Sequence, residues 1–192
     1  MLFRSEFTSC DLVLSTAPIP YVPKLVPALP ADFIARINQI KNIPVACVIL
    51  KLTQPLSENF WMNINDPSIQ IPGVIEYSNL TESKPAVVYA PFYMPKTHPK
   101  WQHSNEALIE EVISYLPKLN PAFNIDWVLA SHCHRYEFAQ TICPVNFYDM
   151  LPPMKTPVDG FYMADTGYYY PEDRSINESI NIAQALVAAT GV

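Results

Sequence analysis

The sequence predicts an α+β fold: a mixed, largely antiparallel sheet of five or more strands with few helices, ending in a strand–loop–helix unit. Three observations lead to this prediction. Several short apolar segments are bounded by Pro, Gly or Asn, which is typical of strands. Residues 105–116 show the clearest helical spacing of apolar side chains. Residues 160–164 then form an apolar strand that a loop and a capped helix follow.

The strands are expected in this order along the chain. Residues 11–15 (DLVLS) indicate a short buried strand, which Thr16-Ala17-Pro18 follows at once. Residues 45–52 are apolar on both faces, which indicates a strand inside a sheet rather than at its edge. Further strands are expected at residues 60–64, 74–80, 86–92, 125–131 and 138–145.

Two helices are expected before the final unit. Asp32 is a candidate N-cap for a short helix whose apolar side includes Phe33 and Ile37. The second helix covers residues 105–116. Pro117 is expected to end it, because proline disfavours the helical conformation in the residue before it.

The last helix is expected at residues 176–189. Ser175 and Glu178 have the S-x-x-E spacing of a capping box at its start. Its predicted packing face is a narrow stripe of apolar side chains, namely Ile176, Ile180, Ala183 and Val187. A helix start facing a strand end is a ready anion site, because its first N–H groups lack intrahelical partners. The alternative is an ordinary strand–turn–helix with Asp165 as a turn residue.

The composition excludes several classes of function. The 192 residues carry a net charge of −6 and include 20 Pro but only 4 Gly, whereas average usage would give about 10 Pro and 13 Gly. No two glycines are close enough to form a glycine-rich phosphate loop. The acidic balance argues against nucleic-acid binding. Four cysteines without a CxxC pair, and no signal-peptide layout or transmembrane segment, predict a cytoplasmic protein.

Three segments carry a resemblance to a known family. Residues 160–165 (GFYMAD) and residues 174–180 (RSINESI) resemble the C-terminal FAD motif of the flavin-containing amine oxidoreductases, which include protoporphyrinogen oxidases and phytoene desaturases. The family pattern is a strand ending in Gly-Asp, then a loop and a helix rich in small residues. Residues 11–18 also resemble the family strand Val-(Ile/Val)-x-Thr-x-Pro, which precedes the substrate-binding region.

The resemblance implies FAD as cofactor, with an incomplete site in this chain. Its cofactor-binding residues would be Thr16, Ala17, Gly160, Ala164, Asp165, Ser175 and Ile176. Asp165 would hydrogen-bond the ribityl or pyrophosphate part of FAD. The backbone at Ser175 and Ile176 would lie near the flavin, where a helix dipole favours the electron-rich reduced ring. Thr16 and Ala17 would line the cofactor cleft.

The resemblance also predicts a division of the chain. Residues 1–30 would be a piece of the FAD-binding domain and its connection, residues 31–145 the substrate-binding sheet domain, and residues 146–192 the C-terminal FAD-motif strand and helix. Ala164 occupies the position of the usual Gly, and the family's N-terminal GxGxxG is absent. We therefore expect a small organic substrate, together with an N-terminal nucleotide-binding partner or a homodimer. The catalytic residues stay unassigned.

Other motifs are open to more than one interpretation. His132-Cys133-His134 places two imidazoles on one face of a strand, as a metal site does, but Cys143 is the only candidate further ligand. We expect no metal and a polar strand end instead. Cys143 with one of these histidines is also a candidate nucleophile, although nothing marks an oxyanion hole.

Two functions from different classes follow. The first is the substrate-binding and partial cofactor-binding portion of an FAD-dependent oxidoreductase that passes a hydride from an organic substrate to flavin. The sheet would then form the floor of an apolar substrate cavity. The second is a non-catalytic module derived from that fold, which binds a small ligand or a partner chain.

Overall fold

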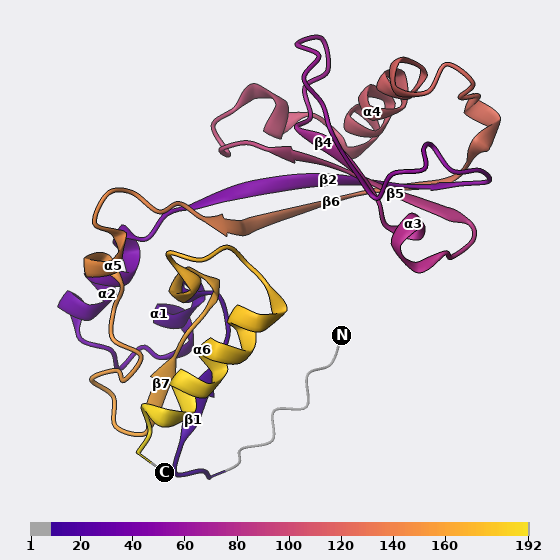
Figure 1. Cartoon of the computed structure of the whole chain (residues 1–192). Helices are drawn as coiled ribbons and strands as arrows, with labels where there is room; N and C mark the ends of the chain where they lie inside the picture. The colour runs from indigo at the N-terminus through magenta and orange to yellow at the C-terminus, as the bar shows by residue number, and fades with distance from the viewer. Residues whose placement is uncertain (1–8, 192) are drawn as a thin grey trace. The chain divides into compact units, whose positions relative to one another are not determined.

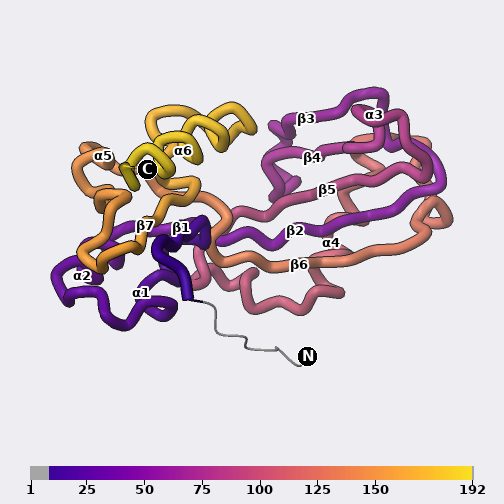
Figure 2. Tube along the Cα trace, turned by 90° about the horizontal axis from the view of Figure 1, so that it is seen from below, coloured from indigo at the N-terminus to yellow at the C-terminus, as the bar shows by residue number. Residues whose placement is uncertain are grey.

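A computed structural model describes residues 9–191 and divides the chain into two compact units. The two ends of the chain, up to Asn42 and from Gln140 onward, form the first unit. Ile43–Ala139 forms the second unit. Figures 1 and 2 trace the elements of each unit along the chain.

The second unit is built on a five-stranded sheet with the order β3-β4-β5-β2-β6, seen side by side in Figure 2. Its strands are β2 (Asn42–Leu52), β3 (Trp61–Asn63), β4 (Gly73–Glu76), β5 (Ala86–Tyr93) and β6 (Val128–Thr141). The neighbours β3, β4, β5 and β2 pair antiparallel. The predicted α+β class with a largely antiparallel sheet is confirmed.

One face of this sheet is buried beneath α4 (Asn105–Leu119). The residues of β2 and β5 alternate between this face and the other, as a pleated strand requires. The side chains packed between sheet and helix include Val48, Leu50, Val88, Ala90, Leu108, Val112 and Leu116. Apart from the buried Pro91, the opposite face carries the half-exposed and exposed positions of the same strands.

The first unit contains a two-stranded parallel sheet, β1 (Val13–Ser15) with β7 (Phe161–Met163). Its helices are α1 (Val22–Leu25), α2 (Ala31–Gln39), α5 (Phe147–Met150) and α6 (Ile176–Ala188), with 3-10 turns η1 (Ile19–Tyr21) and η4 (Thr166–Tyr169). The second unit adds α3 (Tyr77–Thr81), η2 (Pro99–Gln102) and η3 (Ile125–Trp127). A cluster including Ile19, Phe33, Ile37, Phe147 and Met163 forms the main core of the first unit.

The prediction of a strand at residues 74–80 is correct for its first half and wrong for its second half. β4 ends at Glu76, and residues 77–81 form α3. The buried Glu76 carboxylate accepts hydrogen bonds from the backbone N–H groups of Leu56 and Ser57, each at 2.9 Å. This tertiary contact, which local alternation does not encode, holds the chain where the strand gives way to the helix.

The two strands expected at 125–131 and 138–145 are one long strand, β6, preceded by the turn η3. Pro117 does not end α4, which continues to Leu119. Asp32 lies inside the first turn of α2, and Pro30 occupies the N-cap position. Phe33 and Ile37 are buried as expected.

The packing faces of two elements in the first unit differ from prediction. The stripe expected to pack α6 is exposed: Ile176 is 80% exposed, Ile180 52% and Val187 49%. The helix packs through Leu186 instead. The strand expected to be buried at residues 11–15 also has exposed apolar side chains, Val13 among them at 44%. Both differences leave apolar surface uncovered within the part of the chain that the structure describes.

Candidate cofactor site and the open face of the sheet

The carboxyl ends of β1 and β7 lie together because these strands are parallel. Ser15 is the register partner of Met163, and the backbone N–H of Ala164 donates to the Ser15 carbonyl at 3.0 Å. Thr16 and Ala17 follow β1 directly, just as Asp165 follows Ala164. Four of the predicted cofactor-binding residues therefore gather at one edge of this small sheet. Ala164 is buried, whereas Thr16 is exposed.

Asp165 joins the two chain segments at this edge. Its Oδ2 accepts a hydrogen bond from the backbone N–H of Ile19 at 2.8 Å, and its Oδ1 accepts one from the N–H of Gly167, also at 2.8 Å. The second bond makes Asp165 the N-cap of η4. The side chain thus fixes the turn after β7 and ties it to the turn after β1.

Burial raises the pKa of the Asp165 carboxyl above its ordinary value, and its two backbone hydrogen bonds oppose that shift. Burial also raises the pKa of the neighbouring Tyr168, with the charge of Asp165 as a further cause. The Tyr168 hydroxyl donates to the Pro152 carbonyl at 2.7 Å. Both side chains therefore sit in a partly dry environment, where hydrogen bonds to a ligand gain strength.

Ser175 caps the start of α6, as the sequence predicts. Its Oγ accepts from the backbone N–H of Glu178 at 3.1 Å. The hydroxyls of Tyr169 and Ser179 are hydrogen-bonded at 2.8 Å, which connects η4 to the first turn of α6. Ile176 is exposed at this helix start.

Gly160 lies at the opposite end of β7 from Asp165. Its carbonyl accepts from the N–H of Val13 at 2.8 Å, and its φ is +72°. A Cβ at this position would lie 2.6 Å from the Asp11 carbonyl oxygen. Glycine is therefore required here by the backbone, and the structure does not bring this residue to the Asp165 edge.

Sequence reasoning missed the backbone partners of Asp165. Ile19 and Gly167 contribute N–H groups rather than side chains, so residue type gives little sign of them. The Asp-Thr-Gly sequence from Asp165 to Gly167 carried one usable signal, since Asp commonly hydrogen-bonds the backbone two residues later.

The open face of the five-stranded sheet is the second candidate site. Register places Cys47 opposite Pro91, Ile49 opposite Tyr89, and Tyr89 opposite Ile75, so these side chains share the face away from α4. Trp61 continues this row as the partner of Ile75. Figure 2 shows the strands that supply the face lying next to one another.

β6 adds two histidines to the open face. Cys133 belongs to the core beneath α4, and Arg135 donates to Asn105 of α4, so both point to the covered side. Alternation then places His132 and His134 on the open side. Their rings are stacked, with centroids 6.4 Å apart and planes inclined by 21°.

The structure gives no support to His132-Cys133-His134 as a metal site or to Cys143 as a nucleophile. No group of three or more His, Cys, Asp and Glu side chains that could hold a metal occurs among residues 9–191. All four cysteines are free thiols. Burial raises the pKa of Cys143, and raises that of Cys47 to about 11. A raised pKa disfavours the thiolate that a cysteine nucleophile needs.

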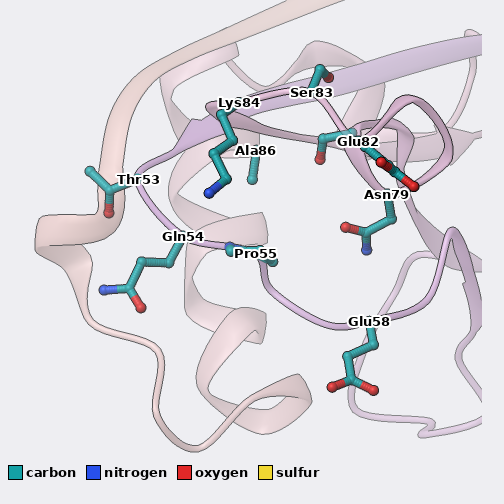
Figure 3. A pocket seen from close by; sticks show the side chains of 10 residues that line it. Thr53, Gln54, Pro55, Glu58, Asn79, Glu82, Ser83, Lys84 and Ala86 are labelled. Carbon is teal, nitrogen blue, oxygen red and sulfur yellow. The ribbon is translucent and has the colours of Figure 1, made fainter.

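A pocket of about 480 Å³ opens at one end of the second unit (Figure 3). It is lined by Thr53, Gln54, Pro55, Glu58, Ser78, Asn79, Glu82, Ser83, Lys84 and Ala86. The side-chain amide of Asn79 has a structural role, because it donates to the backbone carbonyls of Ser57 and Asn59. None of the predicted cofactor-binding residues lines this pocket.

Within residues 9–191, no helix has the length and apolar character needed to cross a membrane.

Comparison with known proteins identifies the class. A sequence model of the flavin containing amine oxidoreductases matches residues 3–177. The chain belongs to this family, whose flavin is FAD, and the resemblance found in residues 11–18 and 160–180 is confirmed at family level. Comparison with curated protein sequences gives no match.

Solved structures share the fold at low identity. Cyclohexylamine oxidase from Brevibacterium oxydans IH-35A is 15% identical with a TM-score of 0.64, covering 92% of this chain and 42% of that one. A protein assigned as a protoporphyrinogen oxidase from Exiguobacterium sp. 255-15 is 19% identical with a TM-score of 0.59, covering 82% and 36%. An oxidoreductase from Methanosarcina mazei is 20% identical with the same TM-score, covering 83% and 38%. The chain thus spans about two fifths of each of these proteins.

Proposed function

We propose that this chain forms the substrate-binding portion and part of the cofactor-binding portion of an FAD-dependent oxidoreductase, in which a hydride passes from an organic substrate to the flavin. The observation that carries the proposal is the parallel pairing of β1 with β7, which brings Thr16, Ala17 and Asp165 to one carboxyl edge. Ligands of open α/β sheets bind outside this edge of parallel strands. The family match supports FAD as that ligand.

The residues at this edge fit one part of FAD better than another. Each Asp165 oxygen accepts one backbone hydrogen bond, and a carboxylate oxygen has room for a second donor. A ligand hydroxyl can supply that donor, whereas a phosphate would be repelled by the carboxylate charge. Asp165 therefore suits the ribityl chain rather than the pyrophosphate. The sequence holds no glycine-rich loop for the pyrophosphate, so the adenine half must bind elsewhere.

The open face of the five-stranded sheet supports the substrate-binding part of the proposal. Ile49, Tyr89, Trp61 and Ile75 present a continuous apolar and aromatic surface on four neighbouring strands. Such surfaces bind organic molecules by removing apolar area from water, at about 25 cal/mol per Å². The chain's own residues would orient the substrate and exclude water, while bound FAD supplies the hydride acceptor.

The uncovered apolar surfaces of the first unit support a macromolecular partner. A parallel sheet is almost always covered on both faces, yet Val13 and Leu14 of β1 and Leu12 just before it are exposed, and α6 exposes Ile180 and Val187. The matched structures are more than twice as long as this chain. We assign these surfaces to a nucleotide-binding polypeptide that covers β1 and carries the glycine-rich loop. The cytoplasmic location stays a prediction.

The cofactor edge is tested by blocking it without touching Asp165. Ala17→Trp places a large side chain where the cleft would open, and we expect riboflavin to bind this variant about tenfold more weakly than wild type. Ala31→Trp, on the exposed start of α2, is the matched control and should bind as wild type does. Quenching of riboflavin fluorescence measures both affinities. Equal affinities for all three proteins would contradict the cofactor edge and favour a non-catalytic module.

The partner surface is tested by the oligomeric state. Ile180→Asp places a charge on the exposed stripe of α6, whereas Ala185→Asp alters an exposed position on another side of the same helix. We expect the purified wild-type chain to be monomeric in sedimentation velocity, with the surface left for the nucleotide-binding polypeptide. A wild-type dimer that Ile180→Asp dissociates and Ala185→Asp leaves intact would assign the surface to a second copy instead.

A further inference from the structure

We propose that the ligand of the open sheet face is an anion with an aromatic or apolar body, rather than a cationic amine. The inference rests on the proposed function, since it takes this face as the substrate floor. It goes further by naming the chemical class of the substrate.

The charge of the open face differs in sign from that of the whole chain. The chain carries −6, yet the acidic residues of the five strands are only Glu76 and Glu137. Glu76 lies buried on the covered side, where two backbone N–H groups hold its carboxylate. Glu137 alternates with Arg135 toward that side and pairs with Lys96 at 2.5 Å. The strands therefore present no carboxylate on the open face.

Donor groups, by contrast, are present on this face. Lys51 is the register partner of Val87, which places its side chain in the same row as Cys47 and Ile49. Backbone bonds from Thr53 to Trp127 (2.8 Å) and from Ile142 to Lys41 (2.9 Å) set β6 beside β2. This register puts His132 and His134 near the Cys47–Ile49 stretch. Each neutral imidazole carries one N–H donor, and Lys51 carries three.

The arrangement of the histidines leaves their edges available. Their stacked rings face each other, so the ring nitrogens lie around the stack rather than inside it. His132 and His134 are exposed in the second unit. A carboxylate, sulfonate or phosphate above them accepts charge-assisted hydrogen bonds from the lysine and hydrogen bonds from the imidazoles. The apolar body of the same molecule then lies along Ile49, Tyr89 and Trp61.

A cationic amine fits this face less well. No strand carboxylate is available to pair with an ammonium group, and Lys51 would repel it. Tyrosine and tryptophan rings attract cations only moderately at exposed sites. The structure thus favours an acidic substrate, even though the family is named for amines.

The test uses two naphthylamine probes that differ by one charge, 8-anilinonaphthalene-1-sulfonate and N-phenyl-1-naphthylamine. Proton NMR of the four histidine rings locates each probe on the intact chain. We expect the sulfonate to shift the His132 and His134 signals but not those of His98 and His103. It should bind this face about fivefold more tightly than the uncharged probe at low salt, and less tightly as salt screens the charges.

Variants separate charge recognition from apolar contact. The double variant His132→Gln/His134→Gln and the variant Lys51→Gln should each reduce the sulfonate preference, with the Trp61 indole NMR signal reporting binding when histidine signals are removed. The control His103→Gln should retain the preference. Equal binding of both probes in all variants would overturn the anion inference and leave the substrate floor intact. If neither probe shifts the signals of His132, His134 or Trp61 in the wild type, the floor itself is wrong.

Discussion

The carboxylate of Asp165 accepts a hydrogen bond from the backbone N–H of Ile19 at 2.8 Å, across 146 positions of the sequence. This bond joins the turn after β7 to the turn after β1. It explains how a motif near the C-terminus and a strand near the N-terminus form a single edge. The first prediction concerns the half-buried carboxylate of Asp165.

Asp165 should make stability fall as the pH rises. Burial raises its pKa above 3.8 in the folded chain, so between 3.8 and the raised value the folded state binds more protons than the unfolded state. The free energy of unfolding then decreases as pH rises through this window. Asp165→Asn removes the titration, so the stability of wild type relative to this variant should fall across the window. Urea unfolding at several pH values measures the difference, and a constant difference would contradict the raised pKa.

Two lysine salt bridges of equal length should differ in how much they contribute to the free energy of unfolding. Lys100 pairs with Glu111 at 2.5 Å with side chains 11% and 21% exposed, whereas Lys96 pairs with Glu137 at 2.5 Å with side chains 51% and 49% exposed. Lys100→Met leaves Glu111 largely buried without its cation, and we expect a loss of about 3 kcal/mol. Lys96→Met should cost at most about 1 kcal/mol. Urea unfolding compares them, and equal losses would contradict the burial argument.

Two glycines with similar backbone angles provide another matched pair. Gly160 and Gly191 have φ values of +72° and +74°. A Cβ at Gly160 would lie 2.6 Å from the Asp11 carbonyl oxygen, whereas nothing lies within 4 Å at Gly191. Gly191→Ala should cost about 1 kcal/mol, the penalty of the left-handed conformation alone. Gly160→Ala should cost clearly more because the backbone at Asp11, just before β1, must move, and thermal unfolding would reveal any failure of this order.

The two faces of α6 should respond differently to truncation. Leu186 is buried and Ile180 is half-exposed. Leu186→Ala should cost about 2–3 kcal/mol through lost burial and the cavity left behind. Ile180→Ala should change the unfolding free energy by no more than about 0.5 kcal/mol in the purified chain. The reverse order in urea unfolding would restore the packing face that the sequence pattern predicts.

The sequence predicted what local patterns encode. Apolar runs and their boundaries identified β2, β5 and β7, and the S-x-x-E spacing identified the Ser175 cap. It failed where tertiary contacts decide, as at Glu76, whose buried hydrogen bonds end β4. It also failed for α6, since periodicity marks apolar residues without saying what covers them. The Asp165 edge was expected from the family resemblance, but its partner Ile19 contributes only a backbone N–H and had no signature.

The central claim is that this chain holds the flavin and ribityl end of FAD but not its adenine end. The most direct measurement is a set of dissociation constants for riboflavin, FAD and ADP with the purified chain, read from flavin fluorescence and from competition by ADP. We expect riboflavin and FAD to bind weakly and with equal affinity, and ADP not to compete. Tight, stoichiometric binding of FAD that ADP displaces would contradict the claim.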